Sequence, residues 1–222
     1  MPITSAAQQA EAPIVMDEII VTATPLNRSS NELTQPIAVL RGTELIRKVE
    51  ASIGETLAGE LGVSTTYFGP VAGRPVIRGQ AGPRISVVEG GVSALDVSDL
   101  SPDHAVSVEP LFAERIEIIR GPATLLYGSS AAGGVVNVMD ARIPEKANES
   151  PISGAAELRA DTASSGRAIA ARLDGNAGVF TWHLNAFDRQ TENIDIPDFA
   201  TADPAERPPE EERGTLLNSF GD

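Results

Sequence analysis

One stretch, at residues 115–138 (RIEIIRGPATLLYGSSAAGGVVNV), constrains the fold more than any other part of the sequence. Ile116 and Ile118 alternate with a charged residue, which is the period-two pattern of a half-buried strand. The pair Gly121-Pro122 ends this strand, because proline has no N–H to give to a ladder. A short helical turn, a run of small residues that lets backbones approach closely, and a valine-rich strand are predicted to follow.

The same stretch resembles the C-terminal half of the plug domain of TonB-dependent outer-membrane receptors. Thr124 stands where that pattern usually has serine. The alternative interpretation is a generic glycine-rich hairpin of a soluble domain. The residues that match the family pattern in order are Ile116, Glu117, Ile118, Arg120, Gly121, Pro122, Leu126, Tyr127, Gly128, Ala131, Gly133, Gly134, Val135, Asn137 and Val138.

Composition limits the classes of protein that this chain can belong to. Of the 222 residues, 41% are hydrophobic, so most of the chain should fold. The formal net charge of −14 argues against a nucleic-acid-binding protein, which needs a basic face. The chain has no cysteine, which excludes disulfides and thiolate metal sites. Because no run of about 18 apolar residues occurs, a membrane role would have to rest on β-strands.

Two segments precede the predicted plug domain. Residues 1–16 are small and polar, and we expect either the remnant of a leader that begins upstream or a disordered tail. Residues 17–23 (DEIIVTA) form a short β-prone run that resembles the TonB box, which in this family pairs as an added strand with the periplasmic C-terminal domain of TonB. The predicted TonB-binding residues are Asp17, Glu18, Ile19, Ile20, Val21, Thr22 and Ala23.

Residues 24–147 are predicted to form a mixed α+β plug domain. A strand is expected at 37–41, a helix at 44–49 with Thr43 as its cap, and a second helix at 53–61. Ser52 and Glu55 form a capping box for the second helix. Further strands are expected at 63–67, 75–79 and 84–92, and the last two resemble plug signatures in which glycines form the turns.

Residues 148–222 are predicted to be the first antiparallel strands of a transmembrane β-barrel that is incomplete in this chain, followed by an extracellular loop. Three runs of about ten residues alternate in polarity, which is the length of a tilted membrane-spanning strand. A soluble β-meander is the alternative. The strands are expected at 154–162, 167–176 and 179–189, and the polar segment 190–222 is expected to be a long extracellular loop.

Motifs of enzymes are absent from the sequence. No phosphate-binding loop of the form G-x-x-x-x-G-K-[ST] occurs, and Ala132 breaks the nucleophile-elbow pattern that starts at Gly128. The two histidines, His104 and His183, are far apart in the sequence, so no Ser-His-Asp arrangement is supported. We therefore expect no catalytic residues and no enzyme activity.

Asp103 and His104 are the candidate metal ligands. A carboxylate and an imidazole suit Zn²⁺, although two ligands do not complete a site, and the simpler interpretation is a turn with a surface histidine. Neighbouring residues on a strand point to opposite faces, so a shared ion requires irregular backbone, which Ser101-Pro102 favours. The segments GQAGPRISVVEGGV and LSPDHAV resemble the zinc-importing branch of the family, in which an Asp-His pair on the plug binds the metal.

The resemblance implies a receptor in the outer membrane of a Gram-negative bacterium that actively imports a scarce nutrient. A metal ion such as zinc is the favoured cargo, and a siderophore or another metal chelate is the alternative. The expected partners are TonB, outer-membrane lipid and the metal ion or chelate, with no nucleic acid and no bound cofactor. The rival from another class is a soluble periplasmic β-rich binding module.

Overall fold

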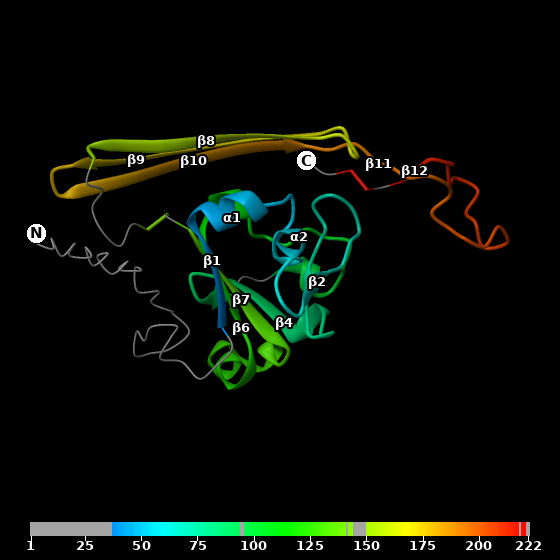
Figure 1. The fold of residues 1–222 in the computed structure, drawn as a ribbon, viewed down its shortest axis with the longest axis horizontal. Coiled ribbons are helices and arrows are strands. Elements are labelled where there is room, and N and C mark those ends of the chain that lie inside the picture. Colours follow the sequence, from blue (N-terminus) through cyan, green and yellow to red (C-terminus); the bar gives the residue numbers. More distant parts are fainter. Residues whose placement is uncertain (1–36, 94–95, 141, 144–149, 218, 221–222) are drawn as a thin grey trace, which may run out of the picture.

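A computed structural model of the chain describes residues 37–93, 96–140, 142–143, 150–217 and 219–220. A globular domain, which is the described part of residues 37–140, lies against a long three-stranded sheet (Figure 1). We call this long sheet the wall sheet. None of the helices in the described residues has the length and hydropathy needed to cross a bilayer.

The globular domain is built on a five-stranded sheet. Its central strands are nearly continuous runs of Ile and Val because both of their faces are covered. Strands β4 and β7 are parallel, and all other neighbours are antiparallel. In spatial order the strands are β1 (Ile37–Arg41), β6 (Ala113–Ile119), β7 (Gly134–Asp140), β4 (Ile85–Glu89) and β5 (Val92–Ser93).

Residues 115–138 fold as their sequence predicts. Strands β6 and β7 pair antiparallel, with Ile116 opposite Val138. Two 3₁₀ segments join them, η5 (Gly121–Tyr127) and η6 (Ser129–Ala131). Close packing is found at Gly134, where a Cβ atom would lie 2.7 Å from the side-chain Cδ1 atom of Ile77 and 3.4 Å from the backbone oxygen of Ile119.

The two short α-helices lie on the face of the five-stranded sheet that is turned toward the wall sheet (Figure 1). Helix α1 (Gly42–Lys48) begins before Thr43, so the predicted cap at Thr43 is wrong, and Arg41 occupies the N-cap without a side-chain hydrogen bond. In helix α2 (Ile53–Leu57) the predicted capping box is confirmed, because the Glu55 N–H donates to Ser52 Oγ (3.2 Å). This helix ends earlier than predicted.

The wall sheet consists of β8 (Ile152–Asp161), β9 (Gly166–Ala177) and β10 (Phe180–Gln190), in the order β10-β9-β8. Register fixes its faces: Leu158 lies opposite Ile169, and Leu173 lies opposite Leu184. These apolar side chains are exposed and point away from the globular domain, whereas Phe187 on the opposite face contacts Phe112 of the domain. The alternation therefore gives one apolar outer face and one largely polar inner face, as membrane-spanning strands require.

Two further two-stranded sheets complete the described fold. Strands β2 (Val63–Thr65) and β3 (Pro75–Ile77) form a hairpin in the globular domain. The segment predicted as an extracellular loop at 190–222 contains a short ladder, in which β11 (Ile194–Asp195) pairs with β12 (Thr215–Leu216). This corrects the prediction of a plain loop, and the ladder forms because Ile194 is buried and gives the ends of the loop an apolar anchor.

Candidate functional site

The two ends of the wall sheet differ, and the difference orients the molecule. A tight turn at 178–179 joins β9 to β10 at one end. The β8–β9 turn and the long connection between β11 and β12 lie at the other end (Figure 1). Outer-membrane barrels carry short turns on the periplasmic side and long loops outside, so we call the end with the long connection the outer end.

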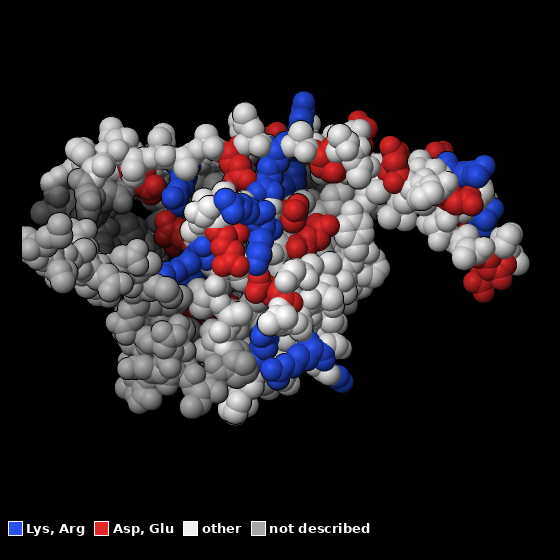
Figure 2. Space-filling view, in the orientation of Figure 1, with Lys and Arg blue, Asp and Glu red and all other residues white. Residues whose placement is uncertain are grey.

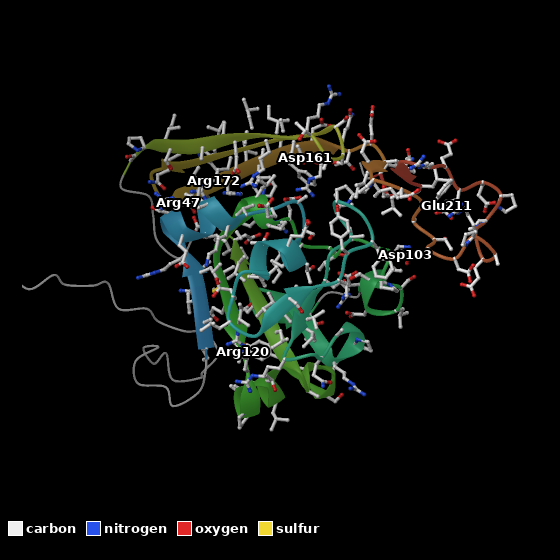
Figure 3. The ribbon with its side chains drawn as sticks, turned by 45° about the vertical axis from the view of Figure 1, so that its right-hand side comes forward. Arg47, Asp103, Arg120, Asp161, Arg172 and Glu211 are labelled. Carbon is white, nitrogen blue, oxygen red and sulfur yellow. The ribbon has the colours of Figure 1, made fainter. Side chains whose placement is uncertain are left out.

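The predicted ligands Asp103 and His104 lie toward the outer end. Figure 3 shows Asp103 on the side of the molecule that carries Asp161 and Glu211. The His104 Nδ1 atom lies 3.1 Å from Asp103 Oδ1, and the two side chains are 53% and 63% exposed. The backbone here is a turn in which the His104 N–H donates to Ser101 O (3.3 Å), so the prediction of irregular backbone is confirmed.

The electrostatics of this turn favour a charged carboxylate. Hydrogen bonds from Ser101 and His104 lower the pKa of Asp103. The described residues contain no group of three or more His, Cys, Asp or Glu side chains that could hold a metal ion. Within those residues Asp103 and His104 are only two candidate ligands side by side, and their role in binding a metal stays a prediction.

A single carboxylate shapes the loop that bears this pair. Asp96 Oδ1 accepts the Ser98 N–H and Asp96 Oδ2 accepts the Ser107 N–H, both at 2.8 Å, so one side chain joins the two ends of the loop. Burial raises the pKa of Asp96, but the hydrogen bonds from Ser107 and Ser98 outweigh burial, and the pKa lies below its ordinary value. We call residues 96–107 the outer loop of the domain.

An ion pair fastens the outer loop to the body of the domain. The buried Arg74 guanidinium donates to Asp99 Oδ1 (2.5 Å) and also to Ser98 Oγ. Because the Arg74 side chain is only 3% exposed, loss of Asp99 would leave its buried charge without an ionic partner, which is costly. Asp103 and His104 are thus presented by a loop that is held at both ends and in its first turn.

The predicted TonB box at 17–23 lies outside the described residues, so the assignment of Asp17 to Ala23 stays a prediction. Strand β1 begins shortly after it.

Sequence reasoning missed the contact between the globular domain and the inner face of the wall sheet. Each wall strand contributes one arginine to it: Arg159 from β8, Arg172 from β9 and Arg189 from β10. Figure 2 shows charged side chains of both signs gathered where the wall sheet crosses the domain. Three arginines on the same face of consecutive strands were a signal in the sequence, although their partners were not.

The three arginines of the wall sheet bind acidic side chains and backbone carbonyl oxygens of the globular domain. Arg172 Nη1 lies 3.0 Å from Glu114 Oε1, and Figure 3 shows Arg172 directed from the wall sheet toward the domain. Arg189 donates to Glu109 Oε1 (2.8 Å) and to Ala51 O (3.0 Å). Arg159 donates to Val49 O.

An aromatic contact accompanies these polar ones. Phe112 is the last residue of the 3₁₀ segment η4 (Pro110–Phe112), of which Glu109 is the N-cap. The Phe112 ring contacts the Phe187 ring of β10 edge to face, with centroids 5.8 Å apart. The carbonyls that accept from Arg159 and Arg189 belong to the link between α1 and α2. The domain is therefore docked on the wall sheet through three of its segments, which are this link, η4 with its N-cap residue Glu109, and the start of β6 at Glu114.

Comparison with known proteins agrees with this architecture. Residues 29–135 match the TonB-dependent receptor plug domain. A hemin receptor of Yersinia pestis is 34% identical over 122 residues, which are 54% of this chain and 18% of that protein. A rhizobactin receptor of Rhizobium meliloti (strain 1021) is 31% identical over 137 residues, which are 60% of this chain and 18% of that protein. The chain thus spans about a fifth of the length of these curated relatives.

The fold of the chain is also found in solved receptors. A siderophore receptor of Acinetobacter baumannii superposes with a TM-score of 0.58 at 21% identity, covering 72% of this chain and 25% of that chain. At this identity the likeness concerns the fold, which is a plug domain with a few antiparallel strands of an unclosed barrel. Residues 29–135 of this chain therefore match the TonB-dependent receptor plug domain, and the described part of the chain has the fold of such a domain with a few antiparallel strands beside it.

Proposed function

We propose that this chain belongs to a receptor that actively imports a metal chelate, such as hemin or a ferric siderophore, across the outer membrane. The observation that carries the proposal is a plug domain docked by ion pairs on the polar face of a sheet whose other face is apolar. The relatives support the class of cargo, since they are receptors for hemin and rhizobactin.

Energy for import enters through residues 17–23 in this proposal. An extended segment that adds as a strand to the periplasmic domain of TonB uses main-chain hydrogen bonds for affinity and alternate side chains for specificity. The segment precedes β1, which begins at Ile37, so in this proposal a pull on residues 17–23 reaches the domain along the chain.

The coupling step is tested with Val21→Pro in a receptor that carries this chain. Proline removes a main-chain N–H from the added strand, so uptake of iron supplied as hemin or siderophore should cease while ligand binding at the cell surface persists. Val15→Pro, outside the predicted box, is the matched control and should transport normally. Uptake by Val21→Pro at the unmodified rate would remove residues 17–23 as the coupling segment.

Free zinc is the second candidate cargo, and the contact between Asp103 and His104 at the outer end favours it. Residues beyond the described ones would have to complete the shell, so binding should be weak in the plug alone and tighter in the whole receptor. Protons compete with a metal for imidazole, so zinc binding should weaken in acid.

Zinc titration of the receptor, unmodified and with Asp103→Ala plus His104→Ala, separates the two cargoes. We expect the double variant to lose zinc affinity if zinc is the cargo. Equal affinity in the two receptors would remove this pair as ligands and leave the metal chelate. Arg213→Ala, on an exposed ion pair of the loop between β11 and β12, controls for a general change of surface charge.

A further inference from the structure

The side chains on the apolar outer face of the wall sheet change in kind from one end of the sheet to the other. Strand register groups them into rows that take one residue from each strand. Near the β9–β10 turn, one row contains Gly175 and Trp182, and the next two rows hold only leucine, alanine and glycine. The row nearest the outer end consists of Ala160, Arg167 and Gln190. The outer end of this face is therefore polar.

The length of this face matches the thickness of the apolar part of a membrane. Phe180 and Gln190 are the first and last of the 11 residues of β10, so about 33 Å of strand separates them at about 3.3 Å per residue. At the tilt of about 40° that is typical of barrel strands, this length spans about 25 Å, which is the height of the apolar band of an outer-membrane barrel. Arg167, opposite Gln190, therefore lies at the outer edge of the band.

The two edges of the band carry different side chains. Phe180 and Trp182 lie at the edge beside the β9–β10 turn, and the Trp182 ring lies across Gly175, where a Cβ atom would overlap it. Aromatic rings are typical of membrane–water interfaces. At the outer edge, the strand residues that the structure describes place the guanidinium of Arg167 and the amide of Gln190 instead. The outer leaflet thus meets a positively charged hydrogen-bond donor.

Arg167 differs in its partner from the arginines of the inner face. Each of those arginines is paired with a glutamate, namely Arg159 with Glu157, Arg172 with Glu114 and Arg189 with Glu109. Arg167 is exposed and donates through Nη2 to Gln190 Oε1 (2.6 Å), which is neutral. Among the described residues no carboxylate forms an ion pair with Arg167. Because a guanidinium has five N–H donors, Arg167 keeps its charge and several donors for a partner outside the sheet.

We propose that Arg167 binds a phosphate group of a lipid in the outer leaflet, and that Gln190 holds the guanidinium in place for it. Arginine suits phosphate because its planar donors can bind two oxygens of the group at once. The proposal goes beyond the proposed function, since it concerns neither the cargo nor TonB.

The depth of Arg167 allows it to stay charged in the membrane. A charged side chain on the lipid face of a barrel is strongly destabilising at the midplane and nearly neutral near the interface. The apolar stem of arginine can also extend along the sheet and bring the guanidinium to the level of the headgroups. Position and chemistry therefore agree on a headgroup phosphate as the partner.

Native mass spectrometry of the whole receptor in mild detergent tests the proposal. The probes are lipid A that carries its phosphates and the same lipid A after a phosphatase has removed them. Arg167→Ala should weaken binding of the phosphorylated form by about tenfold at one site per receptor, and leave binding of the dephosphorylated form unchanged. Arg213→Ala, which removes an exposed arginine from the loop between β11 and β12, is the control and should bind as the unmodified receptor does.

Each outcome decides for or against the lipid. Loss of affinity for the phosphorylated form in Arg167→Ala alone supports the proposal, and Arg167→Lys should retain part of that affinity because it keeps the charge. Unchanged binding in Arg167→Ala overturns the proposal, as does an equal loss in Arg213→Ala. Displacement of lipid A by inorganic phosphate at equal concentration would also overturn it, because the site would then recognise a free anion. None of these outcomes depends on uptake of a chelate or of zinc.

A second variant should have the opposite effect. Asp188 lies on the same face in the row before Arg167, opposite Ile169, so its carboxylate repels a phosphate bound at Arg167. Asp188→Asn should therefore strengthen binding of phosphorylated lipid A by about twofold to threefold, which is the effect of one charge at about 8 Å in water. Weaker or unchanged binding would show that Arg167 serves to neutralise Asp188, and would count against the phosphate site.

Discussion

At the scale of single residues, two buried polar side chains at the centre of the plug domain are bonded to each other. Glu117 and Asn137 are both fully buried in the centre of the five-stranded sheet. The Asn137 amide nitrogen donates to Glu117 Oε2 (3.3 Å), and its carbonyl oxygen accepts the Gly91 N–H (2.9 Å). Arg115 pairs with Glu117. This network joins the family stretch at 115–138 to the β4–β5 turn, where Gly91 has a φ of 82°, a conformation that favours glycine.

Gly54 lies where neighbouring atoms leave no room for a side chain, whereas Gly59 does not. A Cβ atom there would lie 2.7 Å from the backbone carbon of Gly73 and 2.8 Å from that of Arg74, whereas nothing lies within 4 Å of one at Gly59. We expect Gly54→Ala to lower the free energy of unfolding by about 2 kcal/mol through overpacking. Gly59→Ala should change it by about 0.5 kcal/mol, in the stabilising direction. Denaturant unfolding followed by circular dichroism compares the two, and equal effects would contradict the close packing of α2.

At the scale of elements, local patterns predicted what local chemistry controls. Alternation along the wall strands predicted both faces correctly, because register on a two-faced sheet is set by which side chains meet lipid and which meet protein. The capping box at Ser52 was predictable because Ser52 and Glu55, its two members, are only three residues apart in the sequence. The cap of α1 was not, since Arg41 must first end β1, where it pairs with Arg115 across the sheet.

Contacts between elements distant in the sequence were beyond any local pattern. Arg189 lies in the wall sheet and Glu109 is the N-cap residue of η4 in the globular domain, so the two meet only after both parts have folded. The Asp103–His104 pair was found because its residues are neighbours, whereas the contacts of Arg159, Arg172 and Arg189 with the domain needed the structure. The short ladder of β11 and β12 was missed because each strand has two residues.

The outer loop should depend on pH through Asp96. Its pKa is lowered in the folded protein, so the stability that it contributes is present above the pKa of the unfolded chain and is lost as the pH falls through the folded value. At neutral pH, Asp96→Ala should cost about 1 kcal/mol, allowing for partial exposure to solvent. The difference from the unmodified protein should vanish in acid. The rate of amide hydrogen exchange at Ser98 and Ser107 measures how well the two ends of the loop are held, and Glu212→Ala, at an exposed position, is the control. A difference between Asp96→Ala and the unmodified protein that does not depend on pH would show that the Asp96 carboxylate does not hold the two ends together.

At the scale of the whole molecule, the plug domain and the wall sheet have surfaces suited to different surroundings, and mainly polar contacts join them. The plug domain has a closed core around its five-stranded sheet. The wall sheet instead exposes large apolar side chains, among them Leu158, Leu173 and Leu184, on the face turned away from the domain. Arginines on its inner face pair with glutamates of the domain, and the rings of Phe112 and Phe187 meet beside them, so the contact between the parts is mainly polar with one aromatic pair.

This division predicts different solution behaviour for the parts of the chain. Residues 24–147, produced alone, should be a soluble monomer, because the core of the domain does not use the wall sheet. The whole chain should aggregate in buffer without detergent. In the described structure β8 and β10 each pair with β9 alone, so each presents a free edge beside an exposed apolar face. Detergent should cover the apolar face and reduce the aggregation. Size-exclusion chromatography with light scattering measures both fragments, and a monomeric whole chain in detergent-free buffer would show that the apolar face is not made for lipid.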